Sequence, residues 1–264
     1  MTVRYVLSLP GAFERRKEIK KQFSLLGLDF EIVDAKKFSA EEIRGFVKDN
    51  GDDAFQIGVG AVGCFYSHIE AWKRVACSFD RGGFIFEDDA FFSSEARDFC
   101  ADDKWIPEGV DVCQLSYWPS VKHPEGKIFR VLKKINVEKS CYELIRIYSP
   151  CPWGTQGYWI SREGAQKALE MLDKWFVNPV DFYLFSKDSK FWRMGKVYSL
   201  SPAVVTELPG NVSQRISIDS ESGNLSSGGL GDNACRDGVR QGFKKLFEKI
   251  VYLFCEKRYH GFEP

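Results

Sequence analysis

The chain has 264 residues, of which 44% are hydrophobic and 15% aromatic, a composition that supports a substantial core and excludes a disordered protein. Lysine and arginine together number 37, as do aspartate and glutamate, so no net charge indicates binding to nucleic acid. No segment approaches the roughly 20 uninterrupted apolar residues of a membrane-spanning helix, and the N-terminal apolar run is too short for a secretory signal. We therefore expect one large domain or two small ones, located in the cytoplasm.

Strand and helix patterns alternate along the chain. Short apolar runs predict strands, and apolar residues that recur every three or four positions predict helices. In chain order we predict a strand at 5–9, a helix at 14–26, a strand at 30–33, a helix at 58–75, strands at 84–87 and 112–116, a strand at 155–161 that leads into a helix at 162–172, and a strand at 197–200. This alternation predicts an α/β fold with a mostly parallel central sheet flanked by helices.

The C-terminal part of the sequence has a different character. Residues 219–235 are rich in serine, glycine and aspartate, which predicts a flexible linker. Residues 236–258 repeat apolar side chains at helical spacing and carry seven basic and three acidic residues, a net charge of +4. Such a basic amphipathic helix either binds the inner-leaflet membrane surface peripherally or docks on the domain through its apolar face. We therefore divide the chain into a domain at 1–218, a linker at 219–235 and a C-terminal helix at 236–264.

The eight cysteines form no CxxC pair and show no spacing typical of a zinc site. Most have apolar neighbours along the chain, which favours free, buried thiols in a reducing compartment. Disulfides are the alternative.

The acidic triplet Glu87-Asp88-Asp89 lies where an otherwise apolar strand ends, and a further apolar stretch follows it. In open α/β sheets, ligands bind at the carboxyl ends of the strands. Packed like charges raise one another's pKa and destabilise the fold unless a cation compensates them. Carboxylate oxygens suit Mg²⁺ or Mn²⁺, with phosphate and water as further ligands, so the triplet predicts a site for a phosphorylated ligand. A solvated turn after the strand is the alternative interpretation.

Six segments in order resemble glycosyltransferase family 25, the bacterial lipooligosaccharide galactosyltransferases: YVLSLPGAFERR, GCFYSHIEAW, FIFEDDA, GTQGYWISREGAQKAL, PVDFYLF and SPAVVTE. They cover residues 4 to about 207. The resemblance implies a GT-A-like nucleotide-binding fold at 1–218 and an inverting, metal-dependent transfer of galactose from UDP-galactose to a terminal lipooligosaccharide core sugar, of β-1,4 type. UDP-glucose or a UDP-N-acetylhexosamine as donor, or a non-catalytic nucleotide-sugar-binding assembly protein, are the alternatives.

This resemblance suggests a role for each candidate residue. Asp89 is the first choice for contact with Mn²⁺ or Mg²⁺, with Glu87 beside it. Asp181 is expected to take the proton from the acceptor hydroxyl, with Glu207 as the second choice; a helix N-cap is the alternative role of Asp181. The residues expected to contact the UDP-sugar are Ser8, Leu9, Arg15, Arg16, Asp34, Ser67, His68, Glu87, Asp88, Gly154, Thr155 and Gln156.

Several of these side chains have a second interpretation. Arg15 and Arg16 either reach the diphosphate with their planar guanidinium groups or belong to a solvated helix face. His68 is expected to lie off the apolar face of its helix, where it contacts the donor or makes a structural polar contact. Aromatic rings near the predicted strand ends offer faces for a sugar, although most such rings lie in cores; they are Trp118, Trp153, Tyr158 and Trp159.

Overall fold

The computed structural model of this protein describes residues 2–39, 41–42, 59–116, 128–137, 140–149, 152–172 and 178–207. Its elements are β1 (Val3–Ser8), α1 (Phe13–Leu26), β2 (Glu31–Asp34), α3 (Val59–Ala76), β3 (Gly82–Glu87), β4 (Ala90–Phe92), α4 (Ala96–Cys100), β5 (Val112–Gln114), β6 (Ile128–Val137), β7 (Ser140–Ser149), β8 (Gly157–Ser161), α5 (Arg162–Glu170), α6 (Val180–Phe185), α7 (Lys190–Met194), β9 (Val197–Ser201) and β10 (Val205–Glu207). The predicted linker and C-terminal helix lie outside the described residues, so the domain boundaries stay predictions.

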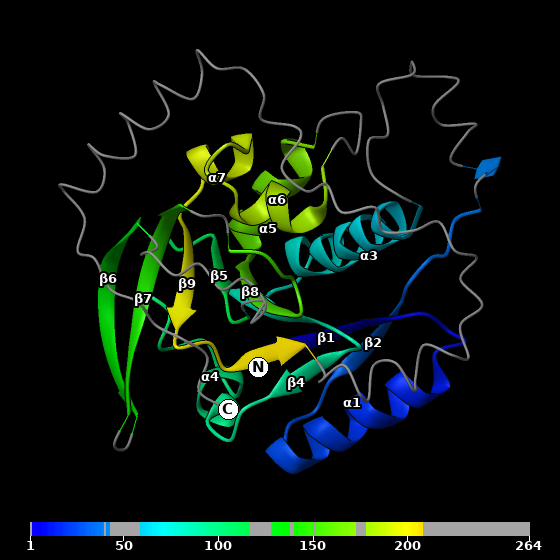
Figure 1. The fold of residues 1–264 in the computed structure, drawn as a ribbon, viewed down its shortest axis with the longest axis horizontal. Helices are drawn as coiled ribbons and strands as arrows, with labels where there is room; N and C mark the ends of the chain where they lie inside the picture. Colours follow the sequence, from blue (N-terminus) through cyan, green and yellow to red (C-terminus); the bar gives the residue numbers. More distant parts are fainter. Residues whose placement is uncertain are drawn as a thin grey trace.

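Eight strands form one sheet in the order β2-β1-β3-β8-β5-β9-β7-β6 (Figure 1). β1 pairs in parallel with β2 and β3, and β5 pairs in parallel with β9. β8 runs antiparallel to β3 and β5, and β7 runs antiparallel to β9 and β6. Six of the eight strands therefore share one direction, with β8 and β7 reversed, and the prediction of an α/β fold with a mostly parallel central sheet is confirmed.

Helices cover both faces of the sheet, and β3 shows why its sequence is apolar throughout. Phe84 and Phe86 pack with residues of α1 and α4 on one face, whereas Ile85 packs with residues of α3 and α5 on the other. Successive side chains of a strand point to opposite faces, so a strand covered on both sides has no polar face. In Figure 1, α1 and α4 lie on one side of the sheet, and α3, α5, α6 and α7 lie on the other.

Two helix ends follow their sequence signals. α1 ends at Gly27, whose φ of 63° is in the left-handed region that glycine adopts without strain. α5 begins after Ser161, whose hydroxyl accepts a hydrogen bond from the N–H of Gly164 at 2.8 Å. Both predicted helices are confirmed.

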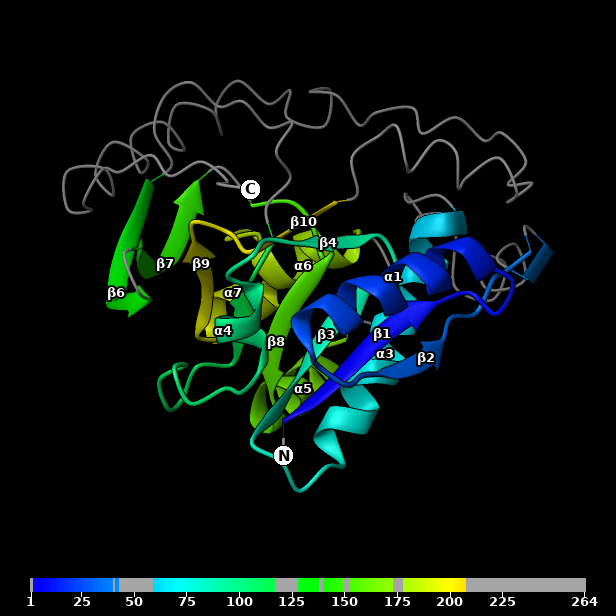
Figure 2. The same cartoon turned by 90° about the horizontal axis from the view of Figure 1, so that it is seen from below.

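Some elements were not predicted from the sequence. β6 and β7 form an antiparallel hairpin at the far edge of the sheet. β4 and β10 form a second, two-stranded sheet in which Glu207 lies opposite Ala90. Figure 2 shows this pair near the ends of β1 and β3. β10 therefore brings residue 207 back to the turn that follows β3.

The described cysteines are all free, as predicted; they are Cys64, Cys77, Cys100, Cys113 and Cys141. Burial is mixed, because Cys100 and Cys113 are buried whereas Cys77 and Cys141 are exposed. Over the described ranges, the helices are too short or too polar to cross a membrane.

Candidate active site

Three parallel strands end at the same edge of the sheet, and each ends in a polar residue: β1 in Ser8, β2 in Asp34 and β3 in Glu87. Ser8 lies opposite Asp34 in the register of β1 and β2. The turn after β3 adds Asp88 to the same edge, where its Oδ2 accepts a hydrogen bond from Ser8 Oγ at 2.7 Å although the two residues are 80 positions apart. This edge is where an α/β sheet binds its ligands.

Arg15 extends from the first turns of α1 to the acidic triplet. Its Nη1 lies 3.1 Å from Asp88 Oδ1 and 3.7 Å from Asp89 Oδ2. Burial lowers the pKa of Arg15, but the charges of Asp88 and Asp89 raise it by more, so the guanidinium is held charged. Arg15 is therefore part of the acidic cluster and does not belong to a solvated helix face.

Arg16 holds the ends of β1 and β2 together. Its Nη2 donates to the Ser8 carbonyl at 2.9 Å and pairs with Asp34, and its Nε donates to Ser8 Oγ at 3.2 Å. The Leu9 carbonyl accepts the N–H of Ala12 at 3.0 Å and so closes the turn into α1. Arg15 thus lies at the triplet, whereas Arg16 lies in the turn behind it.

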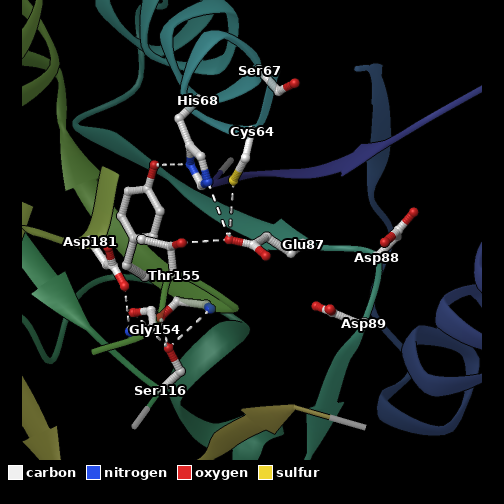
Figure 3. A network of polar contacts seen from close by, with 12 residues as sticks. Cys64, Ser67, His68, Glu87, Asp88, Asp89, Ser116, Gly154, Thr155 and Asp181 are labelled. Atoms are coloured by element: carbon white, nitrogen blue, oxygen red, sulfur yellow. Dashed lines mark hydrogen bonds and ion pairs between the residues drawn. The ribbon is translucent and has the colours of Figure 1, made fainter. Parts of the chain in front are cut away.

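Glu87 is fixed through one of its two carboxylate oxygens (Figure 3). Oε1 accepts the hydroxyl of Thr155, lies 3.3 Å from His68 Nε2, and lies 3.9 Å from the Sγ of Cys64. Burial alone raises the pKa of Glu87, but the hydrogen bond and electrostatic interaction with His68, the hydrogen bond from Thr155 and the charge of Arg15 outweigh it, so its pKa is lowered. Glu87 is thereby held as a carboxylate at the end of β3.

The charge of Asp89 is compensated only in part, by Arg15 at Oδ2. Its Oδ1 is buried and has no hydrogen-bond partner in the described structure. Burial, followed by the charges of Glu87, Asp88 and Glu207, raises the pKa of Asp89 to about 8, although Arg15 opposes this. A buried carboxylate oxygen without a donor is destabilising unless a cation binds it, so the donor set at Asp89 fits a divalent metal ion.

Asp181 lies on the other side of Glu87 from Asp89 in Figure 3. Its Oδ1 accepts the N–H of Phe182 at 2.9 Å, and its Oδ2 accepts the N–H of Gly154 at 3.4 Å. The N-cap of α6 is Pro179, so the alternative role of Asp181 as the N-cap residue is wrong. Burial raises the pKa of Asp181, and the two backbone N–H groups limit the rise.

The loop before β8 forms hydrogen bonds to both Asp181 and Glu87. Gly154 donates to Asp181 from a φ of 108°, a backbone conformation that other residues rarely adopt, and the next residue, Thr155, donates to Glu87. The Gly154 carbonyl accepts Gln114 Nε2 at 2.9 Å, and Gln114 is fully buried. A rigid core contact therefore sets the separation of the two carboxylates.

The family model of glycosyltransferase family 25, described as an LPS biosynthesis protein, matches residues 1–184. The chain belongs to glycosyltransferase family 25. It is 29% identical over 221 residues to the lacto-N-neotetraose biosynthesis glycosyltransferase LgtE of Neisseria meningitidis serogroup B, which covers 77% of this chain and 73% of that protein. It is 27% identical over 221 residues to the lipooligosaccharide biosynthesis protein lic2B of Haemophilus influenzae, which covers 78% of this chain and 76% of that protein.

A solved structure similar to this family 25 chain is a glycosyltransferase involved in the glycosylation of the major capsid of PBCV-1. The match covers 83% of this chain and 100% of the PBCV-1 protein chain, with a TM-score of 0.42 and 8% sequence identity. The resemblance to family 25 seen in the sequence is confirmed by the family model.

Three further candidates of this glycosyltransferase have defined positions. The Ser67 hydroxyl donates to the Gly63 carbonyl of its own helix at 2.7 Å, and in Figure 3 the side chain points away from Glu87. The Gln156 carbonyl accepts the N–H of Glu87 at 3.1 Å, and its buried Oε1 has no partner within the described part of the chain. Glu207 lies opposite Ala90, close enough to Asp89 to raise its pKa.

Two expectations for family 25 site residues were wrong. His68 was expected off the apolar face of its helix, but it is 0% exposed. It makes the structural polar contacts that were the alternative, with the Tyr158 hydroxyl at 2.8 Å and with Glu87 Oε1 at 3.3 Å. Tyr158 and Trp159 were considered as sugar platforms, but both are 0% exposed because β8 lies in the middle of the sheet. Trp118 lies outside the described residues.

Two partners of the site were not predicted from the sequence. Cys64 approaches Glu87, and Gln114 fixes the Gly154 loop. Cys64 and His68 are four residues apart on α3, which places them on one helix face. This spacing could have identified Cys64 as a neighbour of the site. Gln114 offered no such signal, because its partners lie in a distant loop.

Proposed function

We propose that this protein is an inverting, metal-dependent galactosyltransferase that moves galactose from UDP-galactose to a terminal sugar of lipooligosaccharide, with a β-1,4 linkage. The observation that carries the proposal is the buried, unpartnered oxygen of Asp89, next to Arg15 and the end of β3. The two relatives named for lacto-N-neotetraose and lipooligosaccharide biosynthesis support an acceptor of that class.

The residues at the end of β3 suit a metal-bound diphosphate. Asp89 would hold Mn²⁺ or Mg²⁺, with Glu87 beside it, and the ion when bound would stabilise the negative charge of the departing UDP. Arg15 presents a guanidinium that is already charged and partly buried, which suits a phosphate oxygen. Ser8, Asp34 and Arg16 form the floor at the ends of β1 and β2, where the nucleoside would lie.

Asp181 is the proposed base. An inverting displacement requires the base and the leaving group on opposite faces of the sugar, and Asp181 and Asp89 lie on opposite sides of Glu87 (Figure 3). The acceptor oxygen would bond to the anomeric carbon as its proton passes to the Asp181 carboxylate, and the bond to UDP would break with its electron pair leaving on UDP. The raised pKa of Asp181 makes it a better base.

Glu207 is the less suitable base. It lies across from Ala90 and raises the pKa of Asp89, which supports a role near the proposed metal ion. A second carboxylate there adds negative potential for the metal ion and for the positive charge that develops on the sugar.

The basic segment at 236–258 would bring the enzyme to the inner leaflet, where a lipid-linked acceptor lies. This part of the proposal rests on the sequence alone.

The test is a panel of UDP- and GDP-sugars, assayed for hydrolysis and binding with Mn²⁺ and with EDTA. We expect turnover of UDP-galactose with Mn²⁺ and none with EDTA. Turnover of UDP-glucose or a UDP-N-acetylhexosamine in its place would change the donor and keep the mechanism. Binding of a nucleotide sugar that is independent of metal and followed by no turnover would refute the catalytic proposal and favour an assembly protein.

A further inference from the structure

A chain of buried hydrogen bonds reaches Glu87 from inside the core. Trp72 Nε1 donates to the Tyr158 hydroxyl at 2.8 Å, and that hydroxyl lies 2.8 Å from His68 Nδ1. His68 Nε2 then lies 3.3 Å from Glu87 Oε1. Trp72, Tyr158 and His68 are each 0% exposed, so water does not replace any of these contacts. The chain therefore connects α3, β8 and the end of β3 behind the proposed site.

The proton of each group in this chain follows from the chemistry of its partners. An indole N–H only donates, so the Tyr158 oxygen accepts from Trp72. The phenol has one proton, and the His68 Nδ1 is the acceptor at hydrogen-bond distance. If Nδ1 carried a proton, both partners of the buried Tyr158 hydroxyl, Trp72 Nε1 and His68 Nδ1, would be donors. The phenolic proton would then have no acceptor. Nδ1 therefore accepts, and the imidazole proton lies on Nε2 and points at Glu87.

We propose that Tyr158 and Trp72 are positioning residues that fix His68 as the Nε2–H tautomer, so that its proton holds Glu87 Oε1 in place. The hydroxyl of Thr155 also donates to Oε1. His68 and Thr155 both donate to the same oxygen, so Glu87 presents its other oxygen, Oε2, to the nucleotide sugar or to water on the metal ion. This consequence for the nucleotide sugar rests on the proposed function, whereas the tautomer does not.

A metal ion bound at the same place is the competing interpretation. Cys64, His68 and Glu87 are the one group of three potential metal ligands among the described residues, with donor atoms within 4.8 Å of one another. A protonated Nε2 cannot bind a metal ion, so the Nε2–H tautomer excludes metal ligation by His68 at this position. The two interpretations thus predict different protonation of the same nitrogen.

The first experiment determines the tautomer of His68 directly. The chain has three histidines, so ¹⁵N-histidine labelling gives three ring systems, and His123→Gln and His260→Gln assign the remaining one. Long-range ¹H–¹⁵N spectra in EDTA should show His68 as Nε2–H in the wild-type protein. Tyr158→Phe should give a mixture of tautomers. An imidazolium, an Nδ1–H signature, or a Zn²⁺-dependent shift of His68 Nε2 at stoichiometric Zn²⁺ would overturn the proposal.

The matched control is Tyr183→Phe. Tyr183 also loses a hydroxyl, which donates to the Ala168 carbonyl at 2.7 Å, and its ring stacks on Trp72 with centroids 5.8 Å apart. Tyr183→Phe keeps the ring that stacks on Trp72 and removes a hydroxyl that bonds to α5, so it perturbs the same layer and should keep the wild-type tautomer. The wild-type spectrum tests the tautomer even where Tyr158→Phe does not fold.

The second experiment measures binding of UDP-galactose with Mn²⁺ by calorimetry. We expect Tyr158→Phe to weaken binding about 3- to 10-fold, because losing the hydrogen bond that orients His68 at Glu87 costs about as much binding free energy as one hydrogen bond. Tyr183→Phe should bind as the wild type does. Equal affinity in Tyr158→Phe and Tyr183→Phe would refute the link to the site. A wild-type protein that bound no nucleotide sugar would refute the proposed function, and the spectra would still decide the tautomer.

Discussion

Asp89→Asn is the most informative substitution, because the charge of Asp89 is the least compensated at the site. In the metal-free protein the pKa of Asp89 is raised from 3.8 to about 8, first by burial and then by Glu87. Between these two values the folded protein binds one more proton than the unfolded chain, so the free energy of unfolding falls by about 1.4 kcal/mol per pH unit. Above pH 8 the full loss is about 6 kcal/mol at most.

The assay is urea unfolding between pH 4 and pH 9 in EDTA. We expect the unfolding free energy of the wild type to fall as pH rises through this window, whereas Asp89→Asn lacks that fall and is the more stable protein at pH 8. Asp98→Asn is the matched control, because Asp98 is exposed on α4, and it should follow the wild type. Mn²⁺ at 100 times its Kd should then stabilise the wild type by about 2.7 kcal/mol and leave Asp89→Asn unchanged.

Two results would refute this reasoning. If the pH profiles of Asp89→Asn and the wild type superimpose in EDTA, the Asp89 carboxylate is not the strained group. If Mn²⁺ stabilises both proteins equally, the ion binds elsewhere, and the assignment of Asp89 as its ligand is wrong.

The other predictions concern the base and the buried carboxylate of Asp111. Asp181→Asn should lower kcat for galactose transfer about 100- to 10,000-fold and leave the Kd of UDP-galactose within twofold, because the base acts after donor binding. Stopped-time transfer assays measure kcat, and calorimetry measures the Kd. An unchanged kcat would exclude Asp181 as the base. Asp111→Asn should lower the free energy of unfolding by about 1–3 kcal/mol, because the buried carboxylate accepts Lys167 Nζ at 2.8 Å and the N–H of Lys196 at 2.8 Å. Asp111 precedes β5 at the edge opposite the site, so kcat and KM should stay at wild-type values, and a changed KM would contradict this separation.

The candidate site could be predicted only in part, and the reason differs from residue to residue. The apolar run before Glu87 marked a strand, and the rule that ligands bind at strand ends then pointed to the triplet. Asp181 stood out as a single acid at the start of a short aromatic helix. The roles of Arg15 and Arg16 could not be separated, because both lie in one basic helix turn and only the contacts with Asp88 and Asp34 distinguish them.

The fold shows the same limit. Periodicity correctly marked the helices α1, α3 and α5, since each packs one face on a core, and apolar runs correctly marked β1 and β3, since both faces of these strands are covered. The hairpin β6–β7 was missed, although its local alternation of apolar and charged residues, as in Ile145-Arg146-Ile147, carried a strand signal.

The sequence by itself determined the strands and helices with a clear apolar pattern, the end of β3 as an acidic position, and membership in family 25, because these depend on neighbours along the chain and on matching segments. The tertiary structure alone decided the insertion of the reversed strand β8 between β3 and β5. That insertion places Tyr158 opposite Ile85 and brings Thr155 to the oxygen of Glu87 that His68 approaches from α3. Hydrogen-bond partners and pKa values depend on groups tens of residues away along the chain. The contacts of Glu87 Oε1 with His68 and Thr155, and the lack of a partner for Asp89 Oδ1, are therefore set only when the sheet is assembled.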